Sequence, residues 1–382
     1  MKPLRIAHII TSLEYGGAQM MLVKLLRNTD RANAQPRVFG LSAHDDIAPL
    51  LNEAETPFAA LNMRPSAPSL FAFWRLTRQL RAFRPHIVQT WMPHADLMGG
   101  IAAKLAACPR VVWNIRQSSV DPNELPRRTM AVMRLCAALS DRLPTRIVSC
   151  SSAAADSHAA FGYPMDKIAV IPNGFDTRRF QPNQEARAKL RRELRIELND
   201  PVVGIVCRYH EKKDLGNFLQ SATRLLQQQP RAHFILCGEG MESSNAQLNA
   251  EAQRAGMLER LRLIGQRPDT ENVYPAFDLM ALTSAYGEGF PNVVGEAMAC
   301  GVPCAVTDVG ESRQIVGETG FVVPPRSLEA MSDAWARFFA MEPPERAELG
   351  EAARARVERK YGIRAAARKY MKLYEETARR EA

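Results

Sequence analysis

Short apolar runs that alternate with helical patterns constrain the fold of this 382-residue chain more than any other feature. Apolar strands separated by helices are typical of parallel sheets that are covered on both faces. The alternation occurs twice along the chain, so it predicts an α/β protein with two doubly wound, Rossmann-like domains. We expect strands at residues 4–10, 37–41, 86–90, 111–115, 147–150 and 168–171, and again at 202–207, 233–237, 261–264, 279–282, 303–307 and 320–323.

The length of the chain also favours two domains, because it exceeds what one typical core holds. Pro172-Asn173-Gly174 ends the first series of strands, and a highly charged stretch, residues 181–200, precedes the second. We therefore place the linker in that stretch and expect domains at residues 1–180 and 181–362. The last helical pattern, at residues 363–382, is long enough to pack back on the first domain.

The composition indicates a cytoplasmic protein. No apolar stretch approaches the ~20 residues that a membrane-spanning helix needs, and the N-terminus contains no cleavage-like site. The seven cysteines are scattered, and Cys300 with Cys304, the closest pair, is a weak signal for a metal site. We expect buried free thiols in a reducing compartment.

The net charge of +9 belongs entirely to the first half of the chain. Residues 1–180 contain 22 Lys and Arg against 13 Asp and Glu, whereas residues 181–382 contain 28 of each kind. Basic helical patterns at 70–84 and 126–142 contribute to this excess. This excess of positive charge favours an anionic partner. The partner could be the inner face of a membrane, to which the protein would bind peripherally, or an anionic acceptor. The alternative is a basic surface that only aids solubility. Nucleic acid is not indicated, because no binding motif for it is visible.

Two carboxylates eight positions apart form the most specific motif. Glu288 lies in a Gly-rich turn, and Glu296 lies about a turn and a half into the helix that follows. Pro291 suits the first turn of that helix, whose positive end and free N–H groups would then lie beside Glu288. This combination fits a ligand with hydroxyls and phosphate, such as a nucleotide-sugar. The alternative is a capped helix with two solvated glutamates.

Two cations follow the first strand of the second half. Arg208 comes directly after the strand, and Lys213 precedes the next helix. Ligands of doubly wound sheets bind at the carboxyl ends of strands, where an Arg fork and a Lys point charge suit a diphosphate. They would stabilise the negative charge that grows on a departing nucleotide. A solvated surface has the same spacing, so these two residues support the carboxylate motif rather than stand alone.

Glycines follow two other strands. Gly238 and Gly240 allow backbone to approach a ligand, although a tight turn has the same pattern. Gly16 and Gly17 open the first helix, but the third glycine of a dinucleotide fingerprint is missing. We interpret that loop as phosphate-tolerant rather than as an NAD site.

Taken in their order along the chain, these motifs resemble those of family 4 glycosyltransferases. That family has the GT-B fold of two Rossmann-like domains with an interdomain cleft. The resemblance covers nearly the whole chain. It implies a retaining reaction with no metal or other cofactor, a nucleoside-diphosphate sugar donor in the second domain and an acceptor in the first. It also implies that Glu296 holds the ribose hydroxyls, while Glu288 and a stretch of backbone hold the donor sugar and phosphates. That backbone belongs to Phe290, Pro291, Asn292 and Val293.

Many family 4 glycosyltransferases have a His after a first-domain strand, near the reacting sugar, and this chain departs from that pattern. The corresponding stretch here contains Arg116 and no His, while His94 ends another strand of the first half. Both are therefore candidates for the missing role.

The sequence thus predicts a glycosyltransferase that moves a hexosyl or N-acetylhexosaminyl group to a glycan or lipid-linked acceptor for an envelope polysaccharide such as lipopolysaccharide. An enzyme that makes a soluble glycoside is one alternative, and a non-catalytic nucleotide-sugar-binding protein on the same fold is another. The predicted catalytic residues are Glu288, Arg208, Lys213, Arg116 and His94. The predicted donor-binding residues are Gly16, Gly17, Gly238, Phe290, Pro291, Asn292, Val293 and Glu296.

Overall fold

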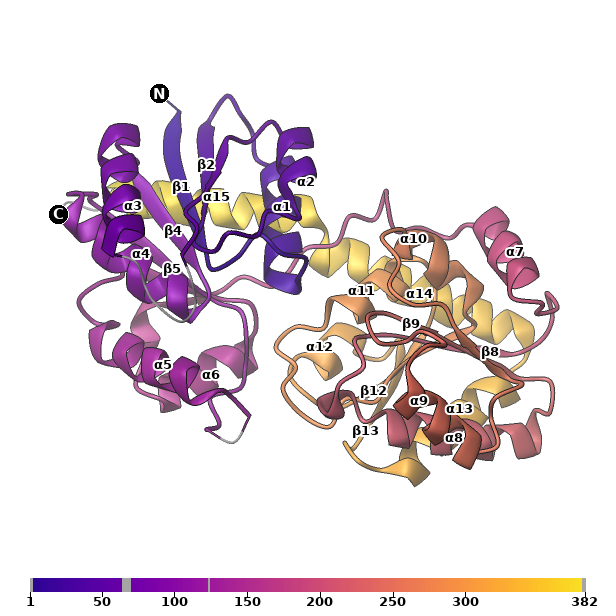
Figure 1. The fold of residues 1–382 in the computed structure, drawn as a ribbon. Helices are drawn as coiled ribbons and strands as arrows, with labels where there is room; N and C mark the ends of the chain where they lie inside the picture. Colours follow the sequence, from indigo (N-terminus) through magenta and orange to yellow (C-terminus); the bar gives the residue numbers. More distant parts are fainter. Residues whose placement is uncertain (1–2, 64–69, 123, 380–382) are drawn as a thin grey trace. The chain divides into compact units, whose positions relative to one another are not determined.

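The computed structural model of the chain describes residues 3–63, 70–122 and 124–379. It divides into two compact units, residues 1–174 with 363–382 and residues 175–362 (Figure 1). The chain therefore passes from one unit to the other at Gly174–Phe175 and again at Gly362–Ile363. The first passage comes six residues before the boundary at 180 that the sequence suggested.

The first unit contains a seven-stranded parallel sheet in the order β3-β2-β1-β4-β5-β6-β7. The short edge strand β3 was not expected, because its three half-buried residues give no distinct apolar pattern. The strands are β1 (Leu4–Ile10), β2 (Ala34–Gly40), β3 (Phe58–Ala60), β4 (Ile87–Trp91), β5 (Val111–Ile115), β6 (Arg146–Ser149) and β7 (Ile168–Val170).

Helices cover both faces of this sheet, and each face has its own apolar core. One core joins α1 (Gly17–Arg27), α2 (Ala48–Glu53) and α15 (Ile363–Arg379) to side chains such as Ile6 and Ile10 of β1. The other joins α3 (Leu70–Phe83), α4 (Pro93–Leu105), α5 (Arg127–Leu139) and α6 (Ser152–Ala160) to Ala7 and Ile9 on the opposite side of the same strand. The alternation of β1 thus supplies both cores, as a doubly wound sheet requires.

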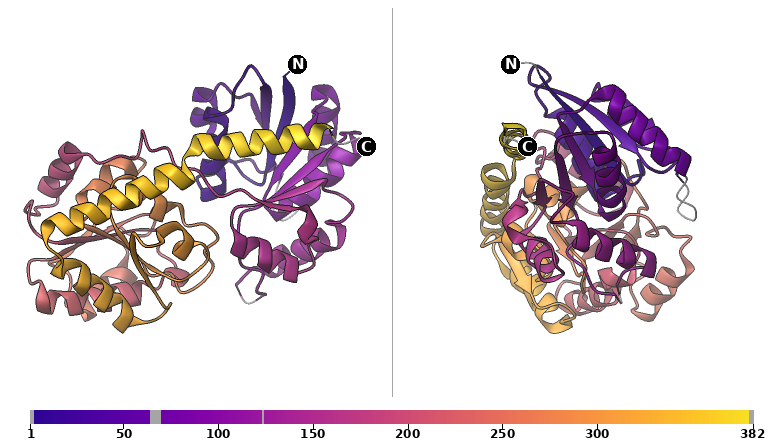
Figure 2. Two further views of the ribbon diagram at one scale, coloured as in Figure 1. Left: turned by 180° about the vertical axis from the view of Figure 1, so that it is seen from behind. Right: turned by 90° about the vertical axis from the view of Figure 1, so that its left-hand side faces the viewer.

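The C-terminal helix α15 lies along the sheet of the first unit (Figure 2). In the sequence, the whole second unit, residues 175–362, comes between α15 and the rest of the first unit. The α15 side chains Tyr370 and Tyr374 are buried against the sheet. The Tyr370 hydroxyl accepts a hydrogen bond of 3.2 Å from Asn114 Nδ2, and its ring stacks on Trp91. The last helix therefore completes the core of the first unit.

The second unit contains a six-stranded parallel sheet in the order β10-β9-β8-β11-β12-β13. One core joins this sheet to α8, α9 and α13. The strands are β8 (Val202–Val206), β9 (His233–Cys237), β10 (Leu261–Leu263), β11 (Leu279–Leu282), β12 (Cys304–Thr307) and β13 (Gly320–Val323). The helices are α7 (Gln184–Glu193), α8 (Leu215–Gln228), α9 (Ala246–Arg254), α10 (Thr270–Val273), α11 (Asn292–Ala299), α12 (Ser312–Val316), α13 (Leu328–Ala340) and α14 (Pro343–Tyr361).

The predicted fold class is confirmed: each unit is a doubly wound parallel sheet. Five strands, β1, β5, β9, β11 and β13, have the bounds expected from the sequence. All seven cysteines are free and buried, as expected. Within residues 3–63, 70–122 and 124–379, no helix has both the length and the apolar character that crossing a membrane requires.

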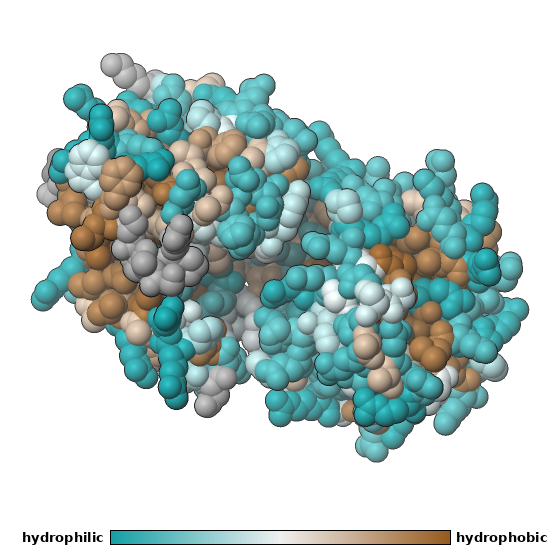
Figure 3. All heavy atoms as spheres, in the orientation of Figure 1, coloured by the Kyte–Doolittle hydropathy of each residue, from teal (hydrophilic) through white to brown (hydrophobic). Residues whose placement is uncertain are grey.

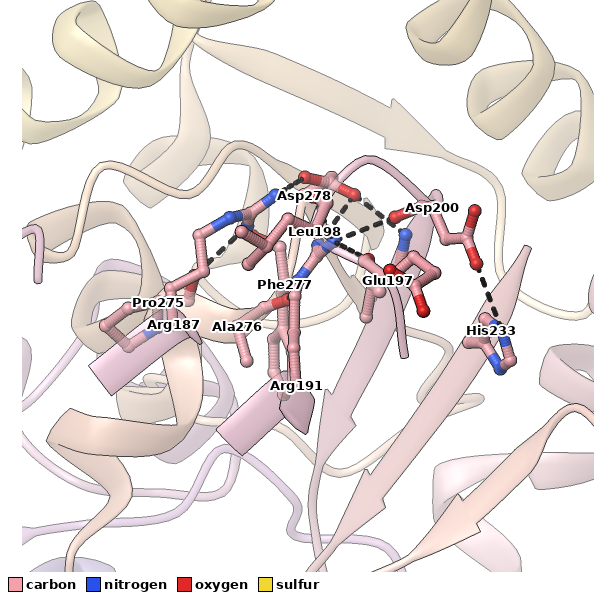
Figure 4. A network of polar contacts seen from close by, with 11 residues as sticks. Arg187, Arg191, Glu197, Leu198, Asp200, His233, Pro275, Ala276, Phe277 and Asp278 are labelled. Atoms are coloured by element: carbon pink, nitrogen blue, oxygen red, sulfur yellow. Dashed lines mark hydrogen bonds and ion pairs between the residues drawn. The ribbon is translucent and has the colours of Figure 1, made fainter. Parts of the chain in front are cut away.

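The charged stretch at residues 181–200 is not a linker, because it contains helix α7 of the second unit. The Arg191 side chain of α7 is completely buried and donates to the carbonyl oxygens of Ala276 and Asp200, each at 2.9 Å, and to Asp278 Oδ2 at 3.0 Å. Arg187 donates to the other oxygen of the same carboxylate at 2.6 Å (Figure 4). Charge therefore anchors α7 at the amino ends of β8 and β11.

Replacing Arg191 with Met should destabilise the protein by about 3–5 kcal/mol, because several buried carbonyl groups, including those of Ala276 and Asp200, would lose their donor. Asp278 would also lose one of its two cations and keep Arg187. Urea unfolding of the second unit, followed by circular dichroism, measures the loss. Arg231→Ala is the matched control, since the Arg231 side chain pairs with Asp200 but is 71% exposed, and it should cost less than about 1 kcal/mol. Equal stability of the two variants would contradict the role of Arg191.

Candidate active site

The order of the second sheet defines a switch point between β8 and β11. Strands β9 and β10 continue on one side of it, and β12 and β13 on the other. In doubly wound sheets ligands bind at such a point, at the carboxyl ends of the strands. Arg208 and Lys213 follow β8 and Glu288 follows β11, so the topology brings three predicted residues to one edge.

Lys213 and Glu288 form a buried ion pair at this edge. Lys213 Nζ donates to Glu288 Oε1, and Ser284 Oγ donates to the same oxygen at 2.6 Å. The two charged side chains are only 13% and 11% exposed. Burial by itself would raise the pKa of Glu288, but the charge and hydrogen bond of Lys213, with the Ser284 bond, outweigh it and hold that pKa below its ordinary value. The carboxylate is therefore ionised at neutral pH, with a cation fixed against it.

Hydrogen bonds between two loops fix the position of this pair. The Thr283 hydroxyl donates to Lys213 O, and Ala285 N donates to Lys212 O, both at 2.8 Å. The loop after β11 therefore holds the backbone of the loop after β8. Thr283 and Ser284 were not predicted as site residues, although two hydroxyl residues directly after a predicted strand are a usable signal.

Two glycines allow neighbouring loops to approach this pair. At Gly238, where φ is +141°, a Cβ atom would lie 1.9 Å from the carbonyl oxygen of Cys207, next to Arg208. At Gly310, where φ is +59°, a Cβ atom would lie 2.2 Å from the carbonyl oxygen of Glu288. Both positions therefore require glycine. Gly238 was predicted from its place after a strand, whereas Gly310 was missed.

The sequence suggested that Pro291 lies in the first turn of its helix. Helix α11 instead begins at Asn292, and Pro291 is its N-cap. Pro291 makes no side-chain cap hydrogen bond, and the first turn of α11 contains no acidic residue. Farther along α11, Glu296 Oε2 accepts a 3.1 Å hydrogen bond from the Tyr274 hydroxyl. Burial, and then the charge of Glu296, raise the pKa of Tyr274 well above its ordinary value, so the phenol stays protonated and orients the carboxylate.

Phe290 fixes the turn between the two carboxylates. Its ring stacks on that of Phe175, with 5.9 Å between the ring centroids. A Cβ atom at Gly295 would lie 2.2 Å from the Phe175 ring, so this glycine lets α11 approach the aromatic pair. Asn292 and Val293 form the first turn of α11, which places the predicted donor-binding backbone beside Glu288.

The candidates of the first unit lie at the carboxyl ends of its strands. After β5, Arg116 Nη2 donates to Asn173 Oδ1 at 2.6 Å, and its guanidinium lies over the Trp91 ring at 5.4 Å. His94 lies in the first turn of α4, where burial lowers its pKa, so it is neutral at neutral pH. The residue before Pro93, Met92, has a φ of +75°.

The Gly16-Gly17 loop after β1 is an ordinary helix start. Gly16 is extended and is the N-cap of α1, and its carbonyl accepts from Met20 N at 2.9 Å. A Cβ atom at Gly16 would lie 2.6 Å from Gln19 Oε1, so glycine leaves room for that side chain. Lys213 and Glu288 of the second unit thus form one ion pair, whereas Arg116 and the Gly16-Gly17 loop of the first unit have separate partners.

Comparison with known proteins identifies this arrangement. A sequence model described as "Glycosyltransferase Family 4" matches residues 15–179, and one described as "Glycosyl transferases group 1" matches residues 186–356. The chain is a family 4-like glycosyltransferase of the GT-B fold. The resemblance noted from the motifs is therefore confirmed.

Relatives of this glycosyltransferase function in polysaccharide and lipopolysaccharide biosynthesis. The lipopolysaccharide core biosynthesis mannosyltransferase LpsB of Rhizobium meliloti is 30% identical over 217 residues, which are 55% of this chain and 61% of LpsB. The UDP-Gal:alpha-D-GlcNAc-diphosphoundecaprenol alpha-1,3-galactosyltransferase of Escherichia coli is 26% identical over 275 residues, 70% of this chain and 69% of that enzyme. Anabaena HepE, solved in complex with UDP and glucose, superposes with a TM-score of 0.86 at 21% identity over 98% of this chain and all of HepE.

Replacing Lys213 with Met in the glycosyltransferase should raise the pKa of Glu288 above its ordinary 4.5, because burial would no longer be offset. In the wild type the lowered pKa means that ionised Glu288 stabilises the fold above pH 4.5 and that this stability is lost as the pH falls through the folded value. Carbon-13 NMR titration of the Glu288 carboxyl measures the shift. Lys212→Met removes a smaller charge effect and should move the pKa less; an unchanged pKa in Lys213→Met would contradict the pairing.

Proposed function

We propose that this glycosyltransferase is a retaining enzyme that transfers a hexosyl or N-acetylhexosaminyl group from a nucleoside-diphosphate sugar to a hydroxyl of a growing, lipid-linked glycan of the cell envelope. The observation that carries the proposal is the fixed Lys213–Glu288 pair at the sheet switch point. Arg208 directly follows β8, and α11 begins soon after Glu288, so both belong to the same edge of the sheet. The E. coli relative, by its name, uses UDP-Gal and a diphosphoundecaprenol-linked acceptor, and HepE binds UDP; both support a nucleotide-sugar donor.

In this proposal, Lys213 and the exposed Arg208 bind the diphosphate. Negative charge grows on the terminal phosphate as its bond to the sugar breaks, so cations held in place stabilise the transition state more than the ground state. Lys213 is held in place by its buried ion pair before the donor binds. The proposal assigns the leaving group to these two side chains and includes no metal or other cofactor.

Glu296 binds the ribose hydroxyls of the nucleotide. Its second oxygen is oriented by the Tyr274 hydroxyl, so the carboxylate is a preformed acceptor for a diol. Glu288 and the backbone of Phe290, Pro291, Asn292 and Val293 bind the sugar and phosphates, and Gly238 allows the donor to approach the loop after β9. The N-terminal end of α11, which has no acidic residue in its first turn, adds positive potential for the phosphates.

The first unit binds the acceptor, with Arg116 and His94 as the candidates for the role of the missing His. The Gly16-Gly17 loop binds the donor. A bond forms between the acceptor oxygen and the anomeric carbon on the face from which the phosphate leaves. The acceptor proton passes to the departing phosphate oxygen. Because the new bond forms on the face that the phosphate leaves, the anomeric configuration is retained. We place the enzyme in the cytoplasm, peripherally bound to the anionic inner face of the membrane through its basic first half.

A direct test incubates the protein with a panel of nucleotide-sugars and lipid-linked acceptors and follows the products by mass spectrometry. The proposal expects release of a nucleoside diphosphate and a product whose new linkage has the donor's anomeric configuration by NMR. An inverted linkage would refute the retaining reaction, and binding of donors without any transfer would favour the non-catalytic alternative.

Glu296→Ala should weaken the binding of UDP by about 1.5–3 kcal/mol, because the ribose diol would lose a charge-assisted hydrogen-bond partner. Isothermal titration calorimetry with free UDP measures this difference. Glu351→Ala, on the exposed surface of α14, is the control and should leave the affinity unchanged. Wild-type affinity in Glu296→Ala would remove this residue from the ribose site.

Arg208→Ala should lower kcat by roughly 100- to 1000-fold with a smaller effect on KM, because the charge it meets develops in the transition state. Lys213→Ala should behave in the same way. Steady-state kinetics with the donor identified by the panel separates the two constants. A variant with full turnover and only a raised KM would be inconsistent with a role at the leaving group.

A further inference from the structure

The start of helix α3 presents apolar side chains to solvent. Leu70, Phe71 and Trp74 are 86%, 66% and 54% exposed, and the rings of Phe71 and Trp74 stack with their centroids 6.5 Å apart. At about 100° per residue, these three side chains share one helix face with Arg78 and Arg81. Leu76 and Leu80 face the core instead. The exposed face is thus apolar in its first turns and basic in its last.

Exposed apolar side chains are concentrated on this side of the first unit. Ten large apolar residues are exposed in the part of the chain that the structure describes, and five of them lie on α3, α4 and α5. Single exposed apolar residues are ordinary, whereas a group of them marks a binding surface. Figure 3 shows apolar atoms at the surface over α3 and α4. The five residues are Leu70, Phe71, Trp74, Leu105 and Leu135.

The same three helices are almost free of negative charge. Their single carboxylate, Asp96, is 2% exposed, so it contributes little to the surface. The Arg78 guanidinium lies over the Trp74 ring at 5.6 Å, and Arg81 donates to Leu105 O at 2.7 Å, so the cations border the apolar group directly. The seven cations on these helices are Arg75, Arg78, Arg81, Lys104, Arg127, Arg128 and Arg134.

We infer that the α3 patch, defined as Leu70, Phe71, Trp74, Arg78 and Arg81, inserts its apolar residues into an anionic membrane while its arginines contact the lipid phosphates. An apolar tip followed by cations, without accessible carboxylates, matches the boundary between acyl chains and anionic headgroups. The inference rests on the proposed function in that a lipid-linked acceptor lies at this boundary, and it names the surface that brings the enzyme there.

The distribution of tryptophans provides a specific probe of insertion. The chain contains four, and Trp91, Trp113 and Trp335 are all completely buried, which leaves Trp74 as the one exposed to solvent. With vesicles of phosphatidylcholine and phosphatidylglycerol, wild-type tryptophan emission should shift to the blue, and lipids brominated on their acyl chains should quench it. Trp74→Phe should bind the vesicles in sedimentation but show neither change.

Paired variants separate insertion from charge. Phe71→Ser with Trp74→Ser should lower the partition coefficient roughly tenfold or more, because two half-exposed apolar side chains no longer enter the lipid. Arg78→Glu with Arg81→Glu should weaken binding by at least about fivefold per arginine, with less weakening at high salt. Leu198→Ser with Leu258→Ser removes two equally exposed leucines from the second unit and should bind as the wild type does.

The inference is overturned if wild-type protein ignores anionic vesicles at low salt, or if the Phe71/Trp74 variant binds them fully. It is also overturned if the patch instead joins two copies of the chain, seen as self-association in sedimentation velocity that the same variant abolishes. Transfer to a water-soluble acceptor should be unchanged in the Phe71/Trp74 variant. Absence of transfer by wild-type protein that still binds vesicles would count against the proposed function alone.

Discussion

The second unit is organised around a charge pair that is buried before any ligand arrives. Removing Lys213 and Glu288 from water is costly, and such a pair is maintained only where hydrogen bonds and geometry compensate for the lost hydration. Here Ser284 and Thr283 after β11, the backbone after β8 and the close approach at Gly310 all contribute. The sheet order, the glycines and the hydroxyls of these loops are best understood as the requirements of that one pair.

The two carboxylates of the motif differ because their surroundings differ. Glu288 is surrounded by cationic and hydroxyl donors and lies in the turn, whereas Glu296 projects from α11 toward a buried phenol. Glu288 is paired with a cation within the protein, whereas Glu296 is oriented by the Tyr274 phenol. A sequence spacing of eight residues therefore produces two different environments.

The strands of both sheets could be predicted from the sequence because they are buried on both faces and appear as plain apolar runs, as in β5 and β9. The sequence also indicated that Lys213 and Glu288 lie at the same edge of the second sheet, because loops after strands of such sheets converge. It failed where tertiary contacts determine the outcome. The charged residues of α7 looked solvated, but Arg191 is buried against Asp278, which lies 87 positions away in the chain. Tyr274 precedes a predicted strand, and no local pattern connects it with Glu296.

The position of α15 has a consequence for how the protein is made. The first unit begins earlier in the sequence, yet Tyr370 and Tyr374, which belong to its core, are synthesised only after the whole second unit. The second unit, which is continuous in sequence, has all its strands available earlier. One face of the first sheet therefore lacks α15 until the second unit has been synthesised, although α1 and α2 can already pack there. In this chain the half that is translated first is the half that is finished last.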